Sequence, residues 1–280
     1  MLKMKVPSIS YDEVLTEIEN VITGNPTLKS NLQGSRTELG SAAKDYSSRA
    51  NNATLFELQR VLTNTSKVIG ELDKDNLVSL YEYYFRDKKC GGIYEKLLHS
   101  ADEKCPFCGG IGLPKNLDHF MPKSAYPQFA VLPVNLIPAC RDCNMGNKGT
   151  GFAATHSEQI LHPFLDADHF FNEQWIFAKY CPAQSGKQSS IEYSVSPPKT
   201  WSEQDQDRVL RHFSDFKIGD RYGIRAATDL AEIENQVHRL RELDYAIDFR
   251  EIILTPIVNV HRFANHWKRV MCIALIEQMS

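Results

Sequence analysis

Two Cys-x-x-Cys pairs constrain the fold of this chain more than any other feature of its sequence. Cys105 and Cys108 form the first pair, Cys140 and Cys143 form the second, and 31 residues separate the two pairs. Four thiolates at this spacing can close a tetrahedral zinc site with no open coordination position, which gives the metal a structural role. The proline and glycines of residues 105–110 suit a tight knuckle turn whose backbone amides point at sulfur. We therefore expect both pairs to fold around one Zn²⁺.

The composition is that of an ordinary soluble protein. The chain has 280 residues, 42% hydrophobic and 24% charged, enough for a sizeable core in one large or two modest domains. Its seven cysteines suit metal ligands in a reducing compartment better than a disulfide framework. The first residues lack the apolar stretch of a secretory signal, and no run of about eighteen apolar residues occurs. We therefore expect a cytoplasmic protein without membrane contact.

Hydrophobic spacing predicts a mostly helical chain with a small hairpin, and therefore the α+β class. We divide it into a helical N-terminal region at 1–100, a zinc-stabilised core at 101–170, and a hairpin followed by helices at 171–280. Short runs rich in β-branched and aromatic residues at 173–180 and 190–196 predict the hairpin. The core is thus expected to lie between two helical flanks.

The N-terminal region opens with a helix signal, Ser10-x-x-Glu13, which is a capping box ahead of apolar residues at helical spacing. Residues 27–50 are rich in Ser, Gly and Lys, so they could form an exposed helix or a partly mobile connector. Further on, Tyr81 and Tyr84 lie in an amphipathic pattern. Together with Tyr83, they could stack on bases, although aromatic residues at helical spacing more often belong to a core.

Polar residues suited to phosphodiester chemistry lie between and just after the cysteine pairs. The relevant stretches are LDHFMPK at 117–123, NLIPAC at 135–140 and CNMGNKG at 143–149. They resemble the HNH endonuclease family, in a bacterial branch with D-H-[FY]-x-P-K followed by N-L-x-x-x-C-x-x-C-N-x-x-x-K-G. The resemblance covers 104–149, roughly a sixth of the chain, with a looser match at 162–166. Many proteins of this branch are encoded in phage-defence or retron-associated systems, which implies an antiviral role.

The resemblance implies that the core is a ββα-metal unit. Asp118 and His119 would end the first strand, Asn135 would lie near the second, and Asn144 would lie on the helix after the second cysteine pair. Adjacent residues on a regular strand face opposite sides. Asp118 and His119 can therefore share one site only where the strand bends or ends.

Each of these residue types has a task in metal-dependent phosphodiester hydrolysis. We expect His119 to be the general base, because a neutral imidazole with an ordinary pKa of about 6.5 accepts a proton at cellular pH. Asp118 and Asn144 would bind Mg²⁺ or Mn²⁺ through oxygen, and Asn135 would orient His119 by a hydrogen bond. The family often has histidine in place of Asn144. An oxygen ligand there favours Mg²⁺ or Mn²⁺ over Ni²⁺ or Zn²⁺.

Three further residues are candidates for the same site. Lys148 and Lys123 could contact phosphate, although a lone lysine is often merely solvated. His162 begins an H-P-F-L-D segment that recurs downstream of this core in related chains, so it could complete the catalytic site. A histidine before proline can equally be a hydrogen-bonded structural residue.

The expected substrate is DNA, bound through its backbone. The formal net charge of −3 means that binding needs a local basic patch or a partner protein. Arginines and lysines of the C-terminal helices could form such a groove or simply be solvated among acidic residues; they are Arg208, Arg211, Arg239, Arg241, Arg262, Lys268 and Arg269. An activating protein such as a defence-system ATPase is a possible partner. The alternatives are a nuclease that cuts RNA or tRNA, and a zinc-stabilised binding module without catalysis.

Overall fold

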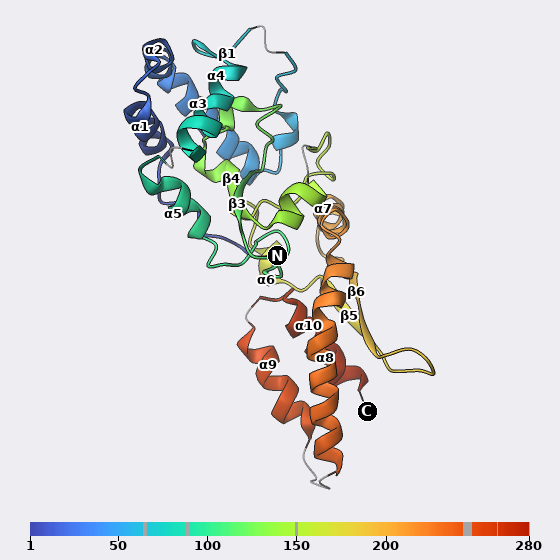
Figure 1. The fold of residues 1–280 in the computed structure, drawn as a ribbon. Helices are drawn as coiled ribbons and strands as arrows, with labels where there is room; N and C mark the ends of the chain where they lie inside the picture. The colour runs from blue at the N-terminus through green and yellow to red at the C-terminus, as the bar shows by residue number, and fades with distance from the viewer. Residues whose placement is uncertain (64–65, 88–89, 149–150, 243–247, 262, 280) are drawn as a thin grey trace.

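The protein is an α+β molecule in which helices predominate. The computed structural model describes residues 1–63, 66–87, 90–148, 151–242, 248–261 and 263–279. Within them lie three two-stranded antiparallel sheets. Figure 1 shows a broad upper part made of the N-terminal and central segments, and a narrower lower part made by the C-terminal helices. No helix in the described ranges is long and apolar enough to span a lipid bilayer.

The N-terminal region is helical, as the sequence predicts. Its first helix begins after Ser10, whose side chain accepts from the Glu13 amide while the Glu13 carboxylate accepts from the Ser10 amide, which confirms the capping box. Residues 27–50 fall in two helices rather than a mobile connector. The elements are α1 (Tyr11–Val21), α2 (Pro26–Gly34), α3 (Arg36–Asn51), η1 (Leu55–Glu57), β1 (Lys67–Ile69), β2 (Leu72–Asp73), α4 (Lys74–Ser79), η2 (Leu80–Asp87), η3 (Cys90–Gly92) and α5 (Ile93–His99).

A short hairpin lies at the centre of the molecule. Its strands β3 (Asn116–His119) and β4 (Leu136–Ala139) pair antiparallel, with Asp118 opposite Ile137 and His119 opposite Leu136. The turns η4 (Pro127–Phe129) and η5 (Pro133–Asn135) fill the connection, and the π-helical segment η6 (Asp142–Lys148) follows β4. The ββα-metal unit itself remains a prediction.

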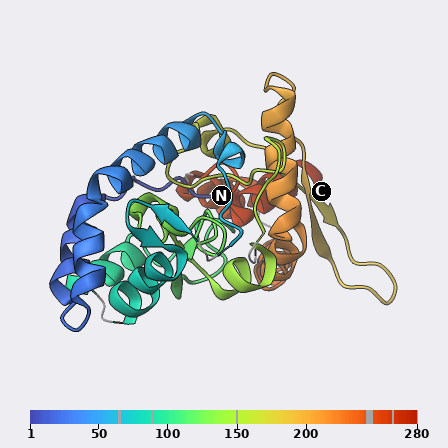
Figure 2. The same cartoon turned by 90° about the horizontal axis from the view of Figure 1, so that it is seen from above.

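The hairpin separates two hydrophobic cores. Leu117 and Leu136 belong to the core that α1, α2, α4, η2 and α5 share. Ile137 and Ala139, on the other face, belong to a larger core that extends to α10. In the view from above, the blue N-terminal helices form an arc around the green central segments (Figure 2). Side chains at the hairpin therefore have packed protein on both faces, which fixes their positions.

The C-terminal region contains the expected hairpin and helices. Its elements are α6 (His169–Asn172), β5 (Ile176–Cys181), β6 (Ser190–Val195), α7 (Glu203–Asp215), α8 (Ile218–Glu242), η7 (Arg250–Leu254), α9 (Thr255–Val260) and α10 (Trp267–Gln278). The hairpin is part of the larger core, because Ile176 and Ile191 are buried in it. α9 has no buried residue, which explains why no apolar periodicity predicts it.

Candidate functional site

The four paired cysteines come together in one buried cluster. The sulfur atoms of Cys105, Cys108, Cys140 and Cys143 all lie within 4.8 Å of one another. Cys108 Sγ and Cys140 Sγ are 4.0 Å apart. A tetrahedral zinc site with metal–sulfur bonds of about 2.3 Å has sulfurs separated by roughly 3.8 Å. The cluster therefore fits one Zn²⁺ held by four thiolates, as the sequence predicts.

Glycines shape the first knuckle of this cluster. Gly109 and Gly110 have φ of 65° and 87°, a left-handed conformation that glycine adopts without strain. The turn directs the Gly112 amide at Cys108 Sγ, 3.4 Å away. A Cβ on Gly112 would lie 2.5 Å from Cys140 Sγ, so the second pair approaches only because no side chain is present. The glycines of this segment thus allow the turn that brings the cysteines together.

A cleft of about 260 Å³ lies beside the hairpin. Four residues that the sequence nominates line it: Asp118, His119, Lys123 and Asn144. The remaining lining residues are Tyr81, Arg86, Tyr94, Asn116, Leu117, Pro122 and Ser124. Asp118 and His119 are only 6% and 7% exposed, so a charge that develops there is poorly screened by water. The cleft is the candidate active site.

Asp118 and His119 share the cleft because β3 ends at His119. Asn116 and Asp118, two residues apart, project from one face of β3, and His119 projects from the other. Past His119 the pairing with β4 stops, and the Phe120 amide instead donates to Asn135 O at 2.8 Å. The strand end thus brings a carboxylate and an imidazole, which alternate on the strand, to one cavity.

The imidazole of His119 has a defined tautomer. Its Nε2 lies 2.8 Å from the backbone oxygen of Ala130, which can only accept, so Nε2 carries the proton in the neutral ring. The lone pair is then on Nδ1. The ring of Tyr81 packs edge-on against His119 at 4.3 Å between centroids. These contacts fix the ring plane, as a positioned base requires.

Asn144 approaches the hairpin from η6. Its Nδ2 donates to Asn116 Oδ1 at 3.0 Å, and its backbone amide donates to Cys140 O at 3.0 Å. The first bond fixes the amide plane, with the side-chain oxygen as the remaining polar atom. Asp118 and Asn144 therefore offer hard oxygen donors in the same cleft, a donor set that suits Mg²⁺ or Mn²⁺.

Asn135 does not orient His119 by a direct hydrogen bond, contrary to the sequence-based expectation. Its Oδ1 accepts from the Met121 amide at 2.7 Å and from Tyr46 Oη at 3.0 Å. Its Nδ2 donates to Met121 O at 3.2 Å and Phe129 O at 2.9 Å. These four bonds use the whole capacity of the amide. Asn135 is fully buried and supports the backbone that follows His119.

His162 does not line the cleft, and its contacts are those of the structural alternative. The ring is fully buried. Nδ1 accepts from the Phe164 amide at 3.2 Å, so Nε2 carries the proton and donates to Tyr46 Oη at 3.2 Å. Tyr46 in turn donates to Asn135. Burial, with Arg208 nearby, lowers the pKa of His162 to about 3 and keeps it neutral.

The structure describes the side chain of only one of the two candidate lysines. Lys123 lines the cleft, with its Nζ 3.3 Å from a Glu82 carboxylate oxygen and 5.8 Å from the centroid of the Tyr81 ring. Its ammonium group is therefore held at the cleft by η2. The side chain of Lys148 lies outside the described residues, and its contact with phosphate remains a prediction.

Residues from the N-terminal region form a wall of the cleft that is not expected from the sequence. Tyr81 Oη donates to Leu117 O at 3.2 Å, and the Leu117 amide donates to Tyr94 Oη at 3.5 Å, so the tyrosines occupy the outer edge of β3. Arg86 lines the same wall. These residues lie more than twenty positions before β3, and no local pattern links them to it. Asn116 could have been predicted from the sequence, because it precedes Asp118 by two positions on the strand and so faces the same side.

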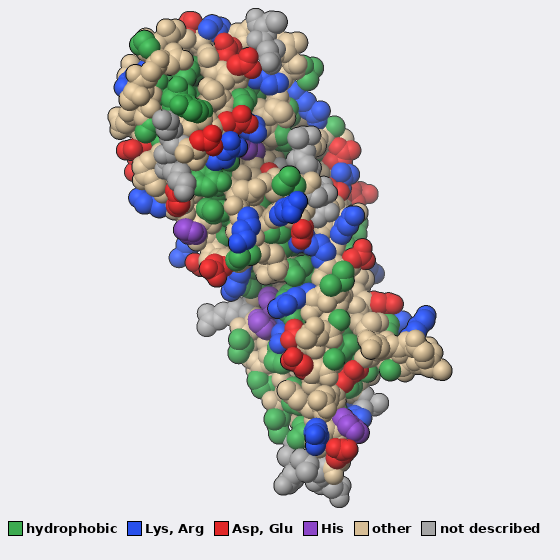
Figure 3. All heavy atoms as spheres, viewed as in Figure 1, with side chains coloured by type: hydrophobic (Ala, Val, Ile, Leu, Met, Phe, Trp, Pro, Cys, Tyr) green, Lys and Arg blue, Asp and Glu red, His purple; other side chains and the backbone are tan. Residues whose placement is uncertain are grey.

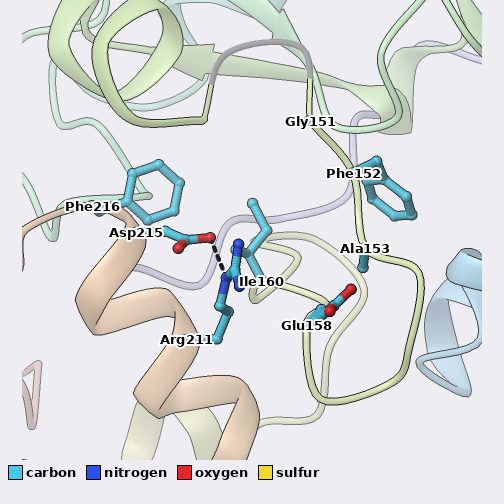
Figure 4. Close-up of a pocket in the computed structure, with 8 residues that line it drawn as sticks. All are labelled: Gly151, Phe152, Ala153, Glu158, Ile160, Arg211, Asp215 and Phe216. Atoms are coloured by element: carbon cyan, nitrogen blue, oxygen red, sulfur yellow. Dashed lines mark hydrogen bonds and ion pairs between the residues drawn. The ribbon is translucent and has the colours of Figure 1, made fainter.

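Three of the basic residues of the C-terminal helices are ion-paired, and one of these is also buried. Arg208 is 1% exposed and is bonded to Asp166, which excludes contact with DNA. Arg211 pairs with Asp215 at 2.7 Å beside a second cavity of about 180 Å³ (Figure 4). Lys268 pairs with Asp229 at 3.1 Å. Arg262 lies outside the described residues. Basic and acidic side chains are mixed over the visible face (Figure 3), as solvated faces are.

Comparison with known proteins finds a relative over the full length of the chain. The chain is 36% identical over 304 residues to protein ea31 of Escherichia phage lambda, covering 99% of this chain and 98% of that protein. A stretch of 74 residues is 35% identical to Septu protein PtuB of Bacillus thuringiensis, covering 25% of this chain and 28% of that protein. No protein-family model and no solved structure matches the chain. The first similarity includes the helical regions on both sides of the cleft.

Proposed function

Because the chain belongs to the family of protein ea31 of phage lambda, which it matches from end to end, we propose one function for the whole chain. That function is metal-dependent hydrolysis of DNA phosphodiester bonds by an HNH-type endonuclease. The observation that supports it is the convergence of Asp118, His119 and Asn144 in one cleft. A protein that only binds needs no buried carboxylate beside an imidazole with a fixed tautomer.

His119 is the proposed general base. Nδ1 takes a proton from water, while the Ala130 oxygen bonded to Nε2–H stabilises the imidazolium that forms. Asn135 acts on His119 indirectly. It hydrogen-bonds the backbone of Met121, which follows His119, and that of Phe129, which precedes the Ala130 oxygen bonded to the ring. Its role is positioning rather than contact with substrate.

Asp118 and Asn144 are the residues that would hold a divalent cation. When bound, Mg²⁺ or Mn²⁺ supplies charge stabilisation to the phosphate and to the leaving 3′ oxygen. Lys123 and Arg86, at the rim, place positive charge where a phosphate backbone would lie. The expected products carry 5′-phosphate and 3′-hydroxyl ends.

An antiviral role is the biological setting we propose. Part of the chain is similar to PtuB, a protein named for the Septu system. Such a role fits a nuclease with a formal net charge of −3, because recruitment or activation would then depend on a partner, for example an ATPase. If the enzyme is strictly activated, the purified protein should cut no nucleic acid alone and should cut it when such a partner is added.

Plasmid cleavage with chosen metals tests the proposal. We expect nicking or linearisation with Mg²⁺ or Mn²⁺, none with EDTA, and more than a hundredfold loss in Asp118→Asn, which keeps the shape but not the charge. Duplex DNA, single-stranded DNA and tRNA in parallel distinguish the nuclease substrates. Cleavage that is faster with Ni²⁺ than with Mg²⁺ and Mn²⁺ would argue against oxygen ligands. Binding without cleavage under every condition would favour the noncatalytic module.

A further inference from the structure

Arg221, near the start of α8, faces the cysteine cluster. Its Nη1 donates to Cys143 Sγ at 3.2 Å and its Nη2 donates to Cys140 Sγ at 3.6 Å. The side chain is only 16% exposed, and Nη2 lies 3.6 Å from an oxygen of Asp142, between the two cysteines. One guanidinium thus contacts both thiolates of the second knuckle. We propose that Arg221 is an outer-shell residue of the metal site, which strengthens metal binding and couples it to the docking of α8.

The negative charge of the proposed zinc site requires compensation, which Arg221 can supply. Four thiolates around Zn²⁺ carry a net double negative charge, and all four cysteines are buried. A buried charge is costly unless it is hydrogen-bonded and compensated. The Gly112 amide contacts Cys108 in the first knuckle, whereas Arg221 supplies both hydrogen bonds and a positive charge to the second. A guanidinium suits this role because its forked donors reach two acceptors at once.

The next residue of α8 contacts the other knuckle. A Cβ on Gly109 would lie 2.4 Å from Tyr222 Oη, so glycine is required for the tyrosine to approach this turn. Tyr222 is fully buried and donates to Asn265 O at 3.2 Å, just before α10. Arg221 and Tyr222 therefore dock the start of α8 on both halves of the cluster.

The position of α8 makes this contact consequential. The helix packs along β6 and also contacts α7 and α10, so it organises the C-terminal region. In Figure 1 it runs from beside α7 and β6 down along the lower part of the molecule. Loss of the metal would leave the cysteines as neutral thiols, which hydrogen-bond Arg221 more weakly than thiolates do, and so would loosen the start of this helix. Metal binding would thus affect the stability of the C-terminal region, which contributes no metal ligand.

The test measures zinc affinity, by competition with a chromophoric chelator, in Arg221→Met, Arg221→Lys and the wild type. Removing an outer-shell partner costs about 10- to 100-fold in metal affinity, and we expect that loss in Arg221→Met. Arg221→Lys keeps the charge but not the fork, so its loss should be smaller. Arg239→Met is the matched control: Arg239 is exposed on the same helix, about 27 Å farther along. It should bind zinc like the wild type.

A second readout separates contact with sulfur from a general effect on folding. Hydrogen bonds draw electron density from a thiolate, so their loss should move the thiolate-to-metal charge-transfer band of the Co²⁺-substituted protein to longer wavelength. Arg221→Met should show this shift and Arg239→Met should not. If Arg221→Met does not fold, a Co²⁺ band and zinc affinity of Arg221→Lys that equal those of the wild type would overturn the inference.

The inference rests on the proposed zinc site, and the outcomes distinguish the two. A wild-type protein that holds no zinc overturns both. Tight zinc binding in the wild type with equal affinity and equal spectra in folded Arg221→Met overturns only the role of Arg221, and leaves the metal site in place.

Discussion

The cysteine cluster and the cleft lie at the same hairpin but are built in different ways. The cluster takes its four ligands from two short motifs, and local turns place them. The cleft combines residues of η2, α5, β3 and η6, which come from the N-terminal and central segments. The cluster has four thiol ligands that could close the coordination of one metal ion, whereas the cleft has oxygen donors beside a positioned imidazole. One site is suited to hold the fold, and the other to act on a substrate.

This difference decides what the sequence could predict. The spacing of Cys105, Cys108, Cys140 and Cys143 identifies the cluster without knowledge of the fold. The strand end at His119 was likewise foreseeable, because two adjacent strand residues can share a site only there. Tyr81 and Tyr94 could not be placed at the edge of β3, since their contact depends on how η2 and α5 pack on the hairpin. Asn135 was expected to contact His119 but supports the backbone beside it, and for His162 the sequence left a catalytic and a structural role open.

Replacement of a cluster cysteine should have the largest effect. Cys140→Ser removes a thiolate from a closed site, and structural zinc contributes on the order of 10 kcal/mol of binding free energy. We expect loss of the metal and unfolding of the central region, measured by zinc content and urea denaturation. Cys181→Ser, at a half-buried position of β5, is the control and should retain both. A folded, zinc-free Cys140→Ser with wild-type stability would refute the structural role.

Asn135→Ala should come next, because it breaks the support of the cleft without touching the cluster. Four hydrogen bonds are lost and their buried partners are left unpaired, at a cost of about 3 kcal/mol or more in unfolding free energy. Zinc content should not change in the protein that remains folded. Asn51→Ala, at an exposed helix end, should change stability by less than about 0.5 kcal/mol. Equal urea midpoints for the two variants would mean that Asn135 is not a support.

Acid should destabilise the protein through its buried neutral histidines. Burial lowers the pKa of His162 and His212 to about 3, against about 6.5 in an unfolded chain. Between these values the unfolded state binds more protons, so stability is full above pH 6.5 and falls as pH decreases. At pH 5, each histidine should lower the free energy of unfolding by about 2 kcal/mol relative to its value above pH 6.5. His162→Gln should show a shallower decline in urea midpoint from pH 7 to 5; an unchanged slope would contradict the assignment.

Tyr81→Phe should have the smallest effect, about 1 kcal/mol, because it removes one hydrogen bond to Leu117 O at the edge of β3. Tyr83→Phe is the control, since Tyr83 is 52% exposed on the same element. Chemical denaturation compares them. If Tyr83→Phe lost as much stability as Tyr81→Phe, the proposed edge contact would not distinguish these tyrosines.

We propose that the cleft performs the chemistry while the cysteine cluster maintains the fold. The most direct test compares plasmid cleavage by the wild type, His119→Ala and the exposed-site control His238→Ala, at equal zinc content. We expect at least a hundredfold loss in His119→Ala alone, with zinc content and urea midpoint close to those of the wild type. Cleavage by folded, zinc-loaded His119→Ala at the wild-type rate would contradict it.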